Sequence, residues 1–81
     1  MLSGAQSAIA LTAAAVTRAK ELQAMGFRTY DALHLACAEQ ATVDVFLTTD
    51  ERVLRLATRH TAHLQVRVAN PLAWLLEVIE P

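Results

Sequence analysis

Two aspartates, Asp31 and Asp50, stand where a carboxylate side chain can take part in chemistry. Asp31 falls in the first turn of a predicted helix, and Asp50 comes just after the end of a predicted strand. Both carboxylates are therefore expected where the chain reverses direction and backbone N–H groups are free. In an open α/β sheet, ligands bind at this rim. The alternative use of both side chains is structural, because an aspartate at the start of a helix also caps it or complements its dipole.

Three arginines recur at helical spacing in the second half of the chain. Arg52, Arg55 and Arg59 fall on one side of a single predicted helix, so we regard them as candidate contacts for the phosphates of a nucleic acid. A solvated helix face explains the same stripe, since charged side chains are mostly exposed.

Another carboxylate, Glu39, lies two turns beyond Asp31 on the same predicted helix. It is too far along the helix to share one metal ion with Asp31, by roughly 12 Å of rise.

The composition describes a small domain with a high apolar content. Of the 81 residues, 54% are hydrophobic and 19% are charged, against typical values of about 45–50% and 25% for soluble proteins. A chain of this length forms one domain at most and buries only a thin core. We therefore expect part of its apolar surface to be covered by a second copy, in a homodimer, or by another protein.

The charge and the cysteine content exclude several classes of protein. A net charge of -1 argues against a generally basic nucleic-acid-binding protein, although it is compatible with a local basic face. The single cysteine, Cys37, excludes a disulfide scaffold or a Cys-rich zinc site and suits a reducing cytoplasm. Residues 1–17 carry no charge and are too weakly apolar for a membrane span. We expect a cytoplasmic protein with no membrane partner.

Apolar periodicity predicts four helices and two strands in one α/β fold. The helices cover about residues 7–25, 30–41, 51–60 and 71–79, and the strands about 43–48 and 64–69. Because a helix joins the two strands, we expect a short parallel sheet in a right-handed βαβ unit, flanked by the four helices. Residues 43–47 are almost continuously apolar, which predicts a strand buried on both faces, whereas residues 64–68 alternate and predict a strand near a sheet edge.

Capping residues set the expected ends of the helices. Gly26 is a C-cap that ends the first helix, and Thr29 is the predicted N-cap of the second. The spacing of Thr48–Glu51 matches a capping box for the third helix, with Asp50 as a rival cap. Asn70–Pro71 combines a cap with a proline at the first helical position, and it opens the last helix.

Three motifs follow one another along the chain. They are Gly-x-x-x-Tyr-Asp-Ala-Leu-His-Leu-Ala at Gly26–Ala36, Phe-Leu-Thr-Thr-Asp at Phe46–Asp50, and Val-Arg-Val-x-Asn-Pro at Val66–Pro71. Together they closely resemble the carboxyl-terminal half of a PIN domain of the VapC-like toxin ribonuclease family. The resemblance covers roughly residues 18–77 and implies a single truncated PIN-like domain with a three-layer arrangement. Residues 1–17 then form an Ala-rich helical lead-in.

The resemblance implies a magnesium- or manganese-dependent endoribonuclease, most often the toxin of a bacterial toxin and antitoxin pair. In that family, acidic side chains at the carboxyl edge of a parallel sheet hold the catalytic metal. By their positions in the motifs, Asp31 and Asp50 match two of these side chains, so the resemblance implies the same role for them. The residue types suit it, because hard divalent cations prefer carboxylate oxygens. The implied partners are an antitoxin-like protein and RNA, whose phosphates Arg52, Arg55 and Arg59 are candidates to contact.

One part of the family pattern has no counterpart in this chain. PIN domains begin with a strand that ends in an aspartate and carry a further acidic residue on an early helix, whereas the first carboxylate here is Glu21. We therefore expect a PIN domain with its front removed and impaired catalysis. The alternative hypothesis is a non-catalytic remnant that dimerises or binds a partner through its apolar surface.

Overall fold

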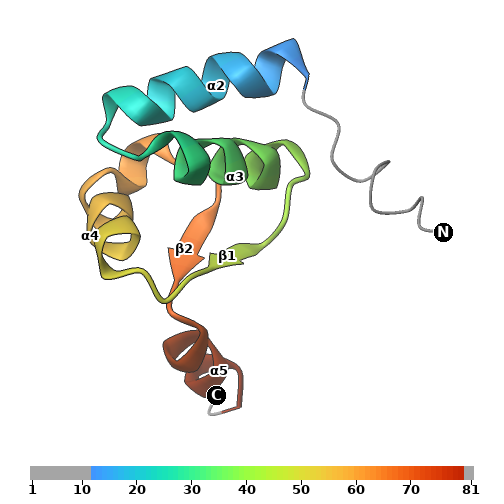
Figure 1. The fold of residues 1–81 in the computed structure, drawn as a ribbon. Coiled ribbons are helices and arrows are strands. Elements are labelled where there is room, and N and C mark those ends of the chain that lie inside the picture. Colours follow the sequence, from blue (N-terminus) through green and yellow to red (C-terminus); the bar gives the residue numbers. More distant parts are fainter. Residues whose placement is uncertain (1–11, 80–81) are drawn as a thin grey trace, which may run out of the picture.

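The computed structural model describes residues 12–79. Its elements, in chain order, are α2 (Ala13–Ala24), α3 (Thr29–Gln40), β1 (Val45–Leu47), α4 (Glu51–Arg59), the short 3-10 helix η1 (Thr61–His63), β2 (Arg67–Ala69) and α5 (Pro71–Ile79). Figure 1 shows α2 and α3 side by side at one end, α4 beside the two strands, and α5 at the opposite end. Among the described residues, four helices and a short two-stranded parallel sheet confirm the predicted α/β class.

Helix α2 begins later than predicted. The backbone of Thr12 is extended, with φ −87° and ψ 165°. Its hydroxyl oxygen accepts a hydrogen bond of 3.1 Å from the N–H of Ala15. Thr12 therefore caps a helix that starts at Ala13, because its side chain satisfies one of the free N–H groups of the first turn. The front of the predicted helix, residues 7–11, lies outside the described residues.

Helices α2 and α3 end in the same hydrogen-bonding pattern. After α2, the N–H of Gly26 donates to the carbonyl of Gln23 at 2.9 Å, and the N–H of Phe27 donates to that of Leu22 at 3.2 Å. This Schellman motif needs a left-handed residue, and Gly26 supplies it with a φ of 115°. The predicted end of α2 is therefore confirmed. Helix α3 repeats both hydrogen bonds around Thr42, whose φ is 53°, an uncommon conformation for a β-branched residue that the sequence did not indicate.

The predicted N-cap of α3 was wrong. Arg28, rather than Thr29, has the extended cap backbone, with φ −71° and ψ 158°. Its carbonyl accepts the first helical hydrogen bond, from Ala32, at 2.7 Å. The hydroxyl of Thr29 instead accepts a hydrogen bond of 2.7 Å from Nε2 of Gln23 on α2. Helix α3 therefore begins one residue earlier than predicted, and no side-chain hydrogen bond caps it.

The two strands pair in parallel, as predicted. Val45, Phe46 and Leu47 stand opposite Arg67, Val68 and Ala69, respectively. The predicted burial of β1 on both faces was wrong, because Val45 and Phe46 are only half-buried and Leu47 is 41% exposed. In the described part of the chain, β2 is the only strand beside β1. Strand β1 thus lacks the cover that a wider parallel sheet with helices on both faces provides.

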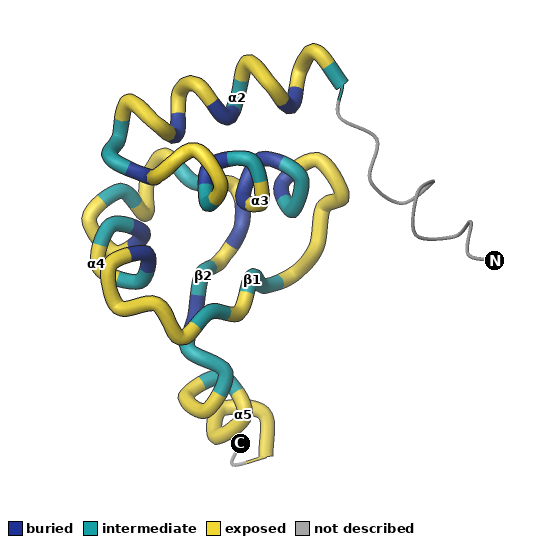
Figure 2. The backbone as a smooth tube through the Cα atoms, in the orientation of Figure 1, coloured by how far each residue is buried: buried dark blue, intermediate teal, exposed yellow. Residues whose placement is uncertain are grey.

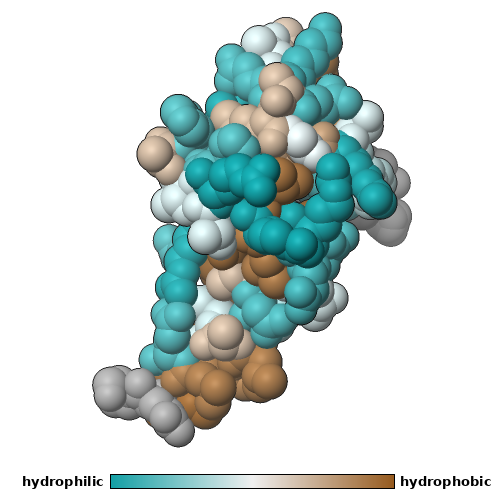
Figure 3. Space-filling model, turned by 90° about the vertical axis from the view of Figure 1, so that its left-hand side faces the viewer, coloured by the Kyte–Doolittle hydropathy of each residue, from teal (hydrophilic) through white to brown (hydrophobic). Residues whose placement is uncertain are grey.

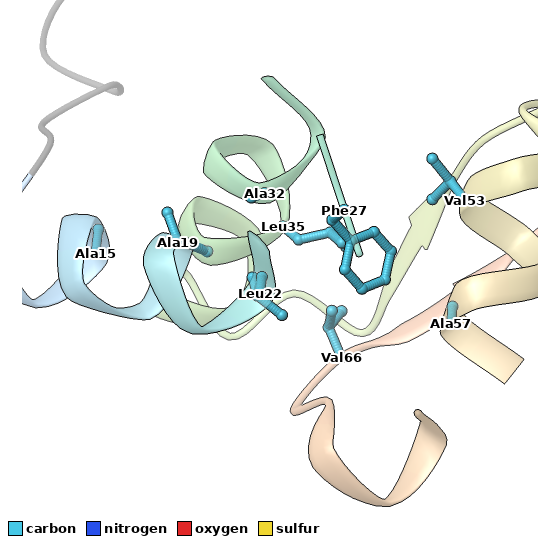
Figure 4. Close-up of a cluster of buried hydrophobic side chains, with 10 residues drawn as sticks. Ala15, Ala19, Leu22, Phe27, Ala32, Leu35, Val53, Ala57 and Val66 are labelled. Atoms are coloured by element: carbon cyan, nitrogen blue, oxygen red, sulfur yellow. The ribbon is translucent and has the colours of Figure 1, made fainter. Parts of the chain in front are cut away.

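The core consists of apolar side chains from α2, α3, α4 and the segments next to them, and all of these except Phe27 are small or medium in size. Its members are Ala15, Ala19, Leu22, Phe27, Ala32, Leu35, Ala36, Val53, Ala57 and Val66. The largest fully buried side chains are Leu22, Leu35 and Val53. Figure 4 shows the ring of Phe27 lying among side chains from several of these elements. Four members from α2 and α3 are alanines, so these two helices can approach each other closely.

A buried ion pair joins three segments of the fold. Nε of Arg18 on α2 donates to Oε1 of Glu39 on α3 at 2.7 Å, and Nη2 donates to Oε2 at 3.1 Å. The same Oε2 accepts the backbone N–H of Gln65 at 2.8 Å, and Nη2 also donates to the carbonyl of His63. The hydrogen bond to Glu39 raises the pKa of Arg18 above its usual value. Glu39 is only 7% exposed and holds the chain that leads into β2 against the α2–α3 pair.

Helix α5 starts as predicted but has no buried residue. Oδ1 of Asn70 accepts the N–H of Leu72 at 2.8 Å, and Pro71 is the first helical residue. Figure 2 shows α5 almost entirely exposed, and Figure 3 shows apolar side chains gathered at this end. An exposed ion pair between Arg67 and Glu77 joins the helix to β2. None of the described helices is both long and apolar enough to cross a membrane.

Candidate active site

The carboxylate of Asp50 caps helix α4. Its Oδ1 accepts hydrogen bonds from the backbone N–H groups of Arg52 at 2.9 Å and Val53 at 3.3 Å. The hydroxyl oxygen of Thr48 accepts a hydrogen bond of 3.1 Å from the backbone N–H of Asp50 itself. The predicted capping box of Thr48 and Glu51 was therefore wrong, and the rival cap Asp50 is the one in use. Asp50 is exposed, and its Oδ2 accepts no hydrogen bond from the described residues.

Asp31 lies in the first turn of α3 and is partly buried. Its charge complements the dipole of the helix at this position. Next to it, the rings of Tyr30 and His34 meet edge to face, with their centroids 4.3 Å apart. Asp31 thus stands beside an aromatic pair, at a helix N-terminus that favours negative charge.

One contact joins the two segments that carry the aspartates. Nη2 of Arg52, two residues after Asp50, donates to the carbonyl oxygen of Gly26, five residues before Asp31, at 2.9 Å. Leu56 of α4 lies at the same turn, since its Cδ2 would be 3.2 Å from a Cβ added to Gly26. The first turn of α4 is therefore held against the turn that leads into α3.

The residue types at the site suit a hard divalent cation, but the described residues do not gather a full set of ligands. Carboxylate oxygens are the ligands that Mg²⁺ and Mn²⁺ prefer. Among residues 12–79, no three His, Cys, Asp or Glu side chains come together in an arrangement that could hold a metal ion. Within this range, Asp31 and Asp50 are therefore two candidate donors without a third.

The three candidate RNA-contacting arginines lie together on the outer side of α4, and we refer to this surface as the arginine face. Arg52, Arg55 and Arg59 are exposed, and with half-buried Leu56 they line a hollow of about 130 Å³. No ion pair among the described residues involves them. Figure 3, which faces the α4 side, shows strongly hydrophilic side chains there.

The shared face was predicted from the sequence, but two of its features were not. These are the position of Leu56 among the arginines and the hydrogen bond from Arg52 to Gly26. Both features depend on where α4 lies relative to the α2–α3 turn. No signal within α4 itself could have shown them.

A PIN domain family model matches residues 4–59 of the chain. The match includes Asp31, Asp50 and the whole arginine face. It begins before residue 18, where the sequence resemblance was placed, and ends before the third motif at Val66–Pro71. No curated protein and no solved structure matches the chain. The matched family pattern thus contains both candidate metal ligands.

Proposed function

The chain belongs to the PIN domain family, and we propose that it is a divalent-metal-dependent endoribonuclease of the toxin type whose own catalysis is impaired. The observation that carries this proposal is the family match over residues 4–59, because that range contains both Asp31 and Asp50. PIN domains generally use divalent metals. The proposed cofactor is therefore Mg²⁺ or Mn²⁺, the proposed substrate is RNA, and the proposed protein partner is an antitoxin-like chain.

The bonding of Asp50 supports weak metal binding. One oxygen of its carboxylate already accepts two backbone N–H groups, which leaves the other oxygen for a cation. A magnesium ion held by one or two carboxylates keeps several water molecules and takes further ligands from substrate phosphates. When bound, such an ion activates water and stabilises negative charge on a phosphodiester. Because Asp31 and Asp50 are the only two proposed donors among the described residues, we expect weak affinity and slow cleavage.

Calorimetric titration of Mn²⁺ into the chain tests the proposed metal site. We expect weak binding that is lost in Asp31→Asn and in Asp50→Asn. It should be retained in Asp44→Asn, the matched control, since Asp44 is an exposed aspartate outside the proposed site. Asparagine caps a helix as well as aspartate does, so Asp50→Asn removes the charge and keeps the cap of α4. Unchanged binding in both site variants would contradict the proposal.

Cleavage of a fluorescent RNA by the same four proteins tests the proposed reaction. We expect slow cleavage that requires Mn²⁺ or Mg²⁺ and that is lost in Asp31→Asn and Asp50→Asn. The Asp44→Asn variant should cleave at the wild-type rate. Metal-dependent cleavage that survives in both site variants would contradict the assignment of these aspartates. If the wild-type chain shows no metal-dependent cleavage, the endoribonuclease proposal fails.

A second candidate function is a non-catalytic module that pairs with a second copy of itself, and the exposed surface of α5 favours it. The large exposed apolar side chains of this helix are Leu72, Leu75, Leu76, Val78 and Ile79. Its one charged residue, Glu77, is paired with Arg67. Two copies of this surface can therefore meet without charge repulsion, in a symmetric contact that covers the apolar area on both.

Light scattering over a concentration series tests this second candidate. We expect a dimeric mass for the wild-type chain and a monomeric mass for Leu72→Ser/Leu76→Ser, because serine removes apolar area from α5. Val16→Ser is the matched control, since Val16 is also exposed, at 39%, but lies on α2. A wild-type chain that stays monomeric at high concentration, or a control that is equally monomeric, would contradict this candidate.

A further inference from the structure

We propose that the arginine face of α4 binds the phosphate backbone of RNA beside Asp50. This inference rests on the proposed function, because it gives the RNA substrate a docking surface next to a candidate metal ligand. It extends that function by naming the part of the substrate that is recognised. Contacts to phosphates position a nucleic acid and carry no base sequence information directly.

The spacing of the arginine face places three cations along one line of the helix. Arg52 and Arg55 are three residues apart and Arg59 follows four residues later, so all three point to the same side. They extend over about 10 Å of helix rise, which is longer than one phosphate group. A nucleic acid backbone laid along α4 can therefore meet more than one of them. The line starts two residues after Asp50.

These cations are available to a ligand, in contrast to two other arginines of the chain. Arg18 and Arg67 are each held by glutamates. Arg55 and Arg59 are exposed and form no ion pair with any described residue. Of the seven lysines and arginines in the chain, three thus share one side of a nine-residue helix. The overall net charge of -1 conceals this local positive charge.

The packing of α4 holds the arginine face in place. Val53 and Ala57 are buried in the core, and Leu56 lines the hollow among the arginines. Arg52 donates one hydrogen bond to the carbonyl of Gly26. A guanidinium has five N–H donors, so Arg52 keeps donors for a phosphate while its position is fixed.

The chemistry of arginine favours phosphate as the ligand. The planar guanidinium matches the oxygens of a phosphate and can bind them with two parallel hydrogen bonds. RNA presents its phosphates at regular intervals along one chain, which suits cations arranged in a line. An acidic peptide also carries negative charge, but its carboxylates lie on flexible side chains at variable spacing. We therefore assign the surface to RNA and use polyglutamate as the competing ligand.

Binding of a short fluorescein-labelled oligouridylate to the full chain in EDTA, at several KCl concentrations, tests the inference. Each phosphate neutralised on a single strand contributes about −0.7 to the slope of log K against log salt, so three arginines predict a slope of about −2. The variant Arg55→Gln/Arg59→Gln keeps the contact of Arg52 to Gly26 and should reduce the slope to about −0.7. Between 50 and 200 mM salt, affinity should fall roughly 20-fold for the wild-type chain and roughly 3-fold for this variant.

Lys20→Gln/Arg28→Gln is the matched control, because it removes the same two charges at exposed positions outside α4. We expect this control to keep the wild-type slope. The inference is overturned if the Arg55→Gln/Arg59→Gln variant keeps the wild-type slope or if the control loses as much as that variant. It is also overturned if the chain binds polyglutamate but not the oligouridylate.

The same assay separates this inference from the proposed catalysis. EDTA removes divalent metal, so Asp31→Asn and Asp50→Asn should bind the oligouridylate at least as tightly as the wild-type chain. If these variants bind RNA and no protein cleaves it with metal present, the proposed reaction fails and the arginine face stands. If RNA is cleaved but the Arg55→Gln/Arg59→Gln variant keeps the wild-type salt slope, only the proposed role of the arginine face is contradicted.

Discussion

The α2–α3 pair and helix α5 use their apolar residues in opposite ways. Helix α5 is mostly apolar and contains three leucines, yet none of its residues is buried. Helix α2 carries three charged residues, Arg18, Lys20 and Glu21, yet it buries Leu22 completely. The difference is the presence of a facing surface. Helices α2 and α3 cover each other, whereas α5 extends from the end of β2 away from them (Figures 1 and 2).

Small side chains let α2 and α3 pack closely against each other. Ala15 and Ala19 on α2 and Ala32 and Ala36 on α3 are each 4% exposed or less. Such alanines, four residues apart, lie on one face of each helix, and their small side chains allow a short distance between the two helix axes. Among the described residues, α5 has no such partner surface. Apolar content alone therefore did not determine which helix contributes to the core.

The largest expected effect comes from removing a core side chain of the α2–α3 pair. Leu35→Ala should lower the free energy of unfolding by about 3 kcal/mol, because it leaves a cavity where a fully buried leucine was. The same change on α5, Leu76→Ala, should lower it by less than about 0.5 kcal/mol, since Leu76 is 47% exposed. Urea unfolding followed by circular dichroism at low protein concentration measures both. Equal losses would break the contrast between the two regions.

A smaller loss is expected from the buried ion pair that ties the α2–α3 pair to β2. Glu39→Gln should lower the free energy of unfolding by about 2 kcal/mol, because it leaves Arg18 without its carboxylate but keeps an acceptor for the Gln65 N–H. Glu21→Gln is the control, since Glu21 also bonds Arg18 but its side chain is 58% exposed, against 4% for Glu39. The same urea experiment applies. If Glu21→Gln costs as much as Glu39→Gln, burial does not explain the effect.

An effect of opposite sign is expected at the end of α3. Thr42→Gly should raise the free energy of unfolding by about 0.5–1 kcal/mol, because the strain of a left-handed threonine exceeds the extra entropy of an unfolded glycine. Gly26→Ala should lower it, since Gly26 has a φ of 115° and its new Cβ would lie 3.2 Å from Leu56. Thermal unfolding compares the two. A lower midpoint for Thr42→Gly would disprove strain at this turn.

The smallest effect is expected on α5. The hydrogen bond from Arg67 lowers the pKa of Glu77 below its ordinary value of 4.5, so any contribution of this pair is present above pH 4.5 and is lost as the pH falls through the lower pKa. Glu77→Gln should therefore be slightly less stable than the wild-type chain at pH 7 and equal to it well below pH 4.5. The effect stays small because both side chains are exposed. Urea midpoints at the two pH values measure it, and a difference that grows on acidification would contradict it.

Sequence patterns predicted the features that depend on a few neighbouring residues. Gly26 ends α2, Asn70–Pro71 begins α5, and the helix between the two strands makes them parallel. The PIN resemblance was also carried by short contiguous motifs, and the family match confirms it at the level of the family. The metal-binding roles of Asp31 and Asp50 stay predictions.

The sequence by itself determined the α/β class, the order of the elements and the helix ends that one glycine or one proline sets. Only the tertiary structure decided that Glu39 is buried in an ion pair with Arg18 and that Arg52 donates a hydrogen bond to Gly26. It also decided that much of β1 and α5 is exposed to solvent. The reason is distance along the chain. The first two contacts join residues 21 and 26 positions apart. The exposure of α5 depends on whether another described element packs against it, and none buries any of its residues. Such outcomes depend on which surfaces meet, and no local window of residues contains that information.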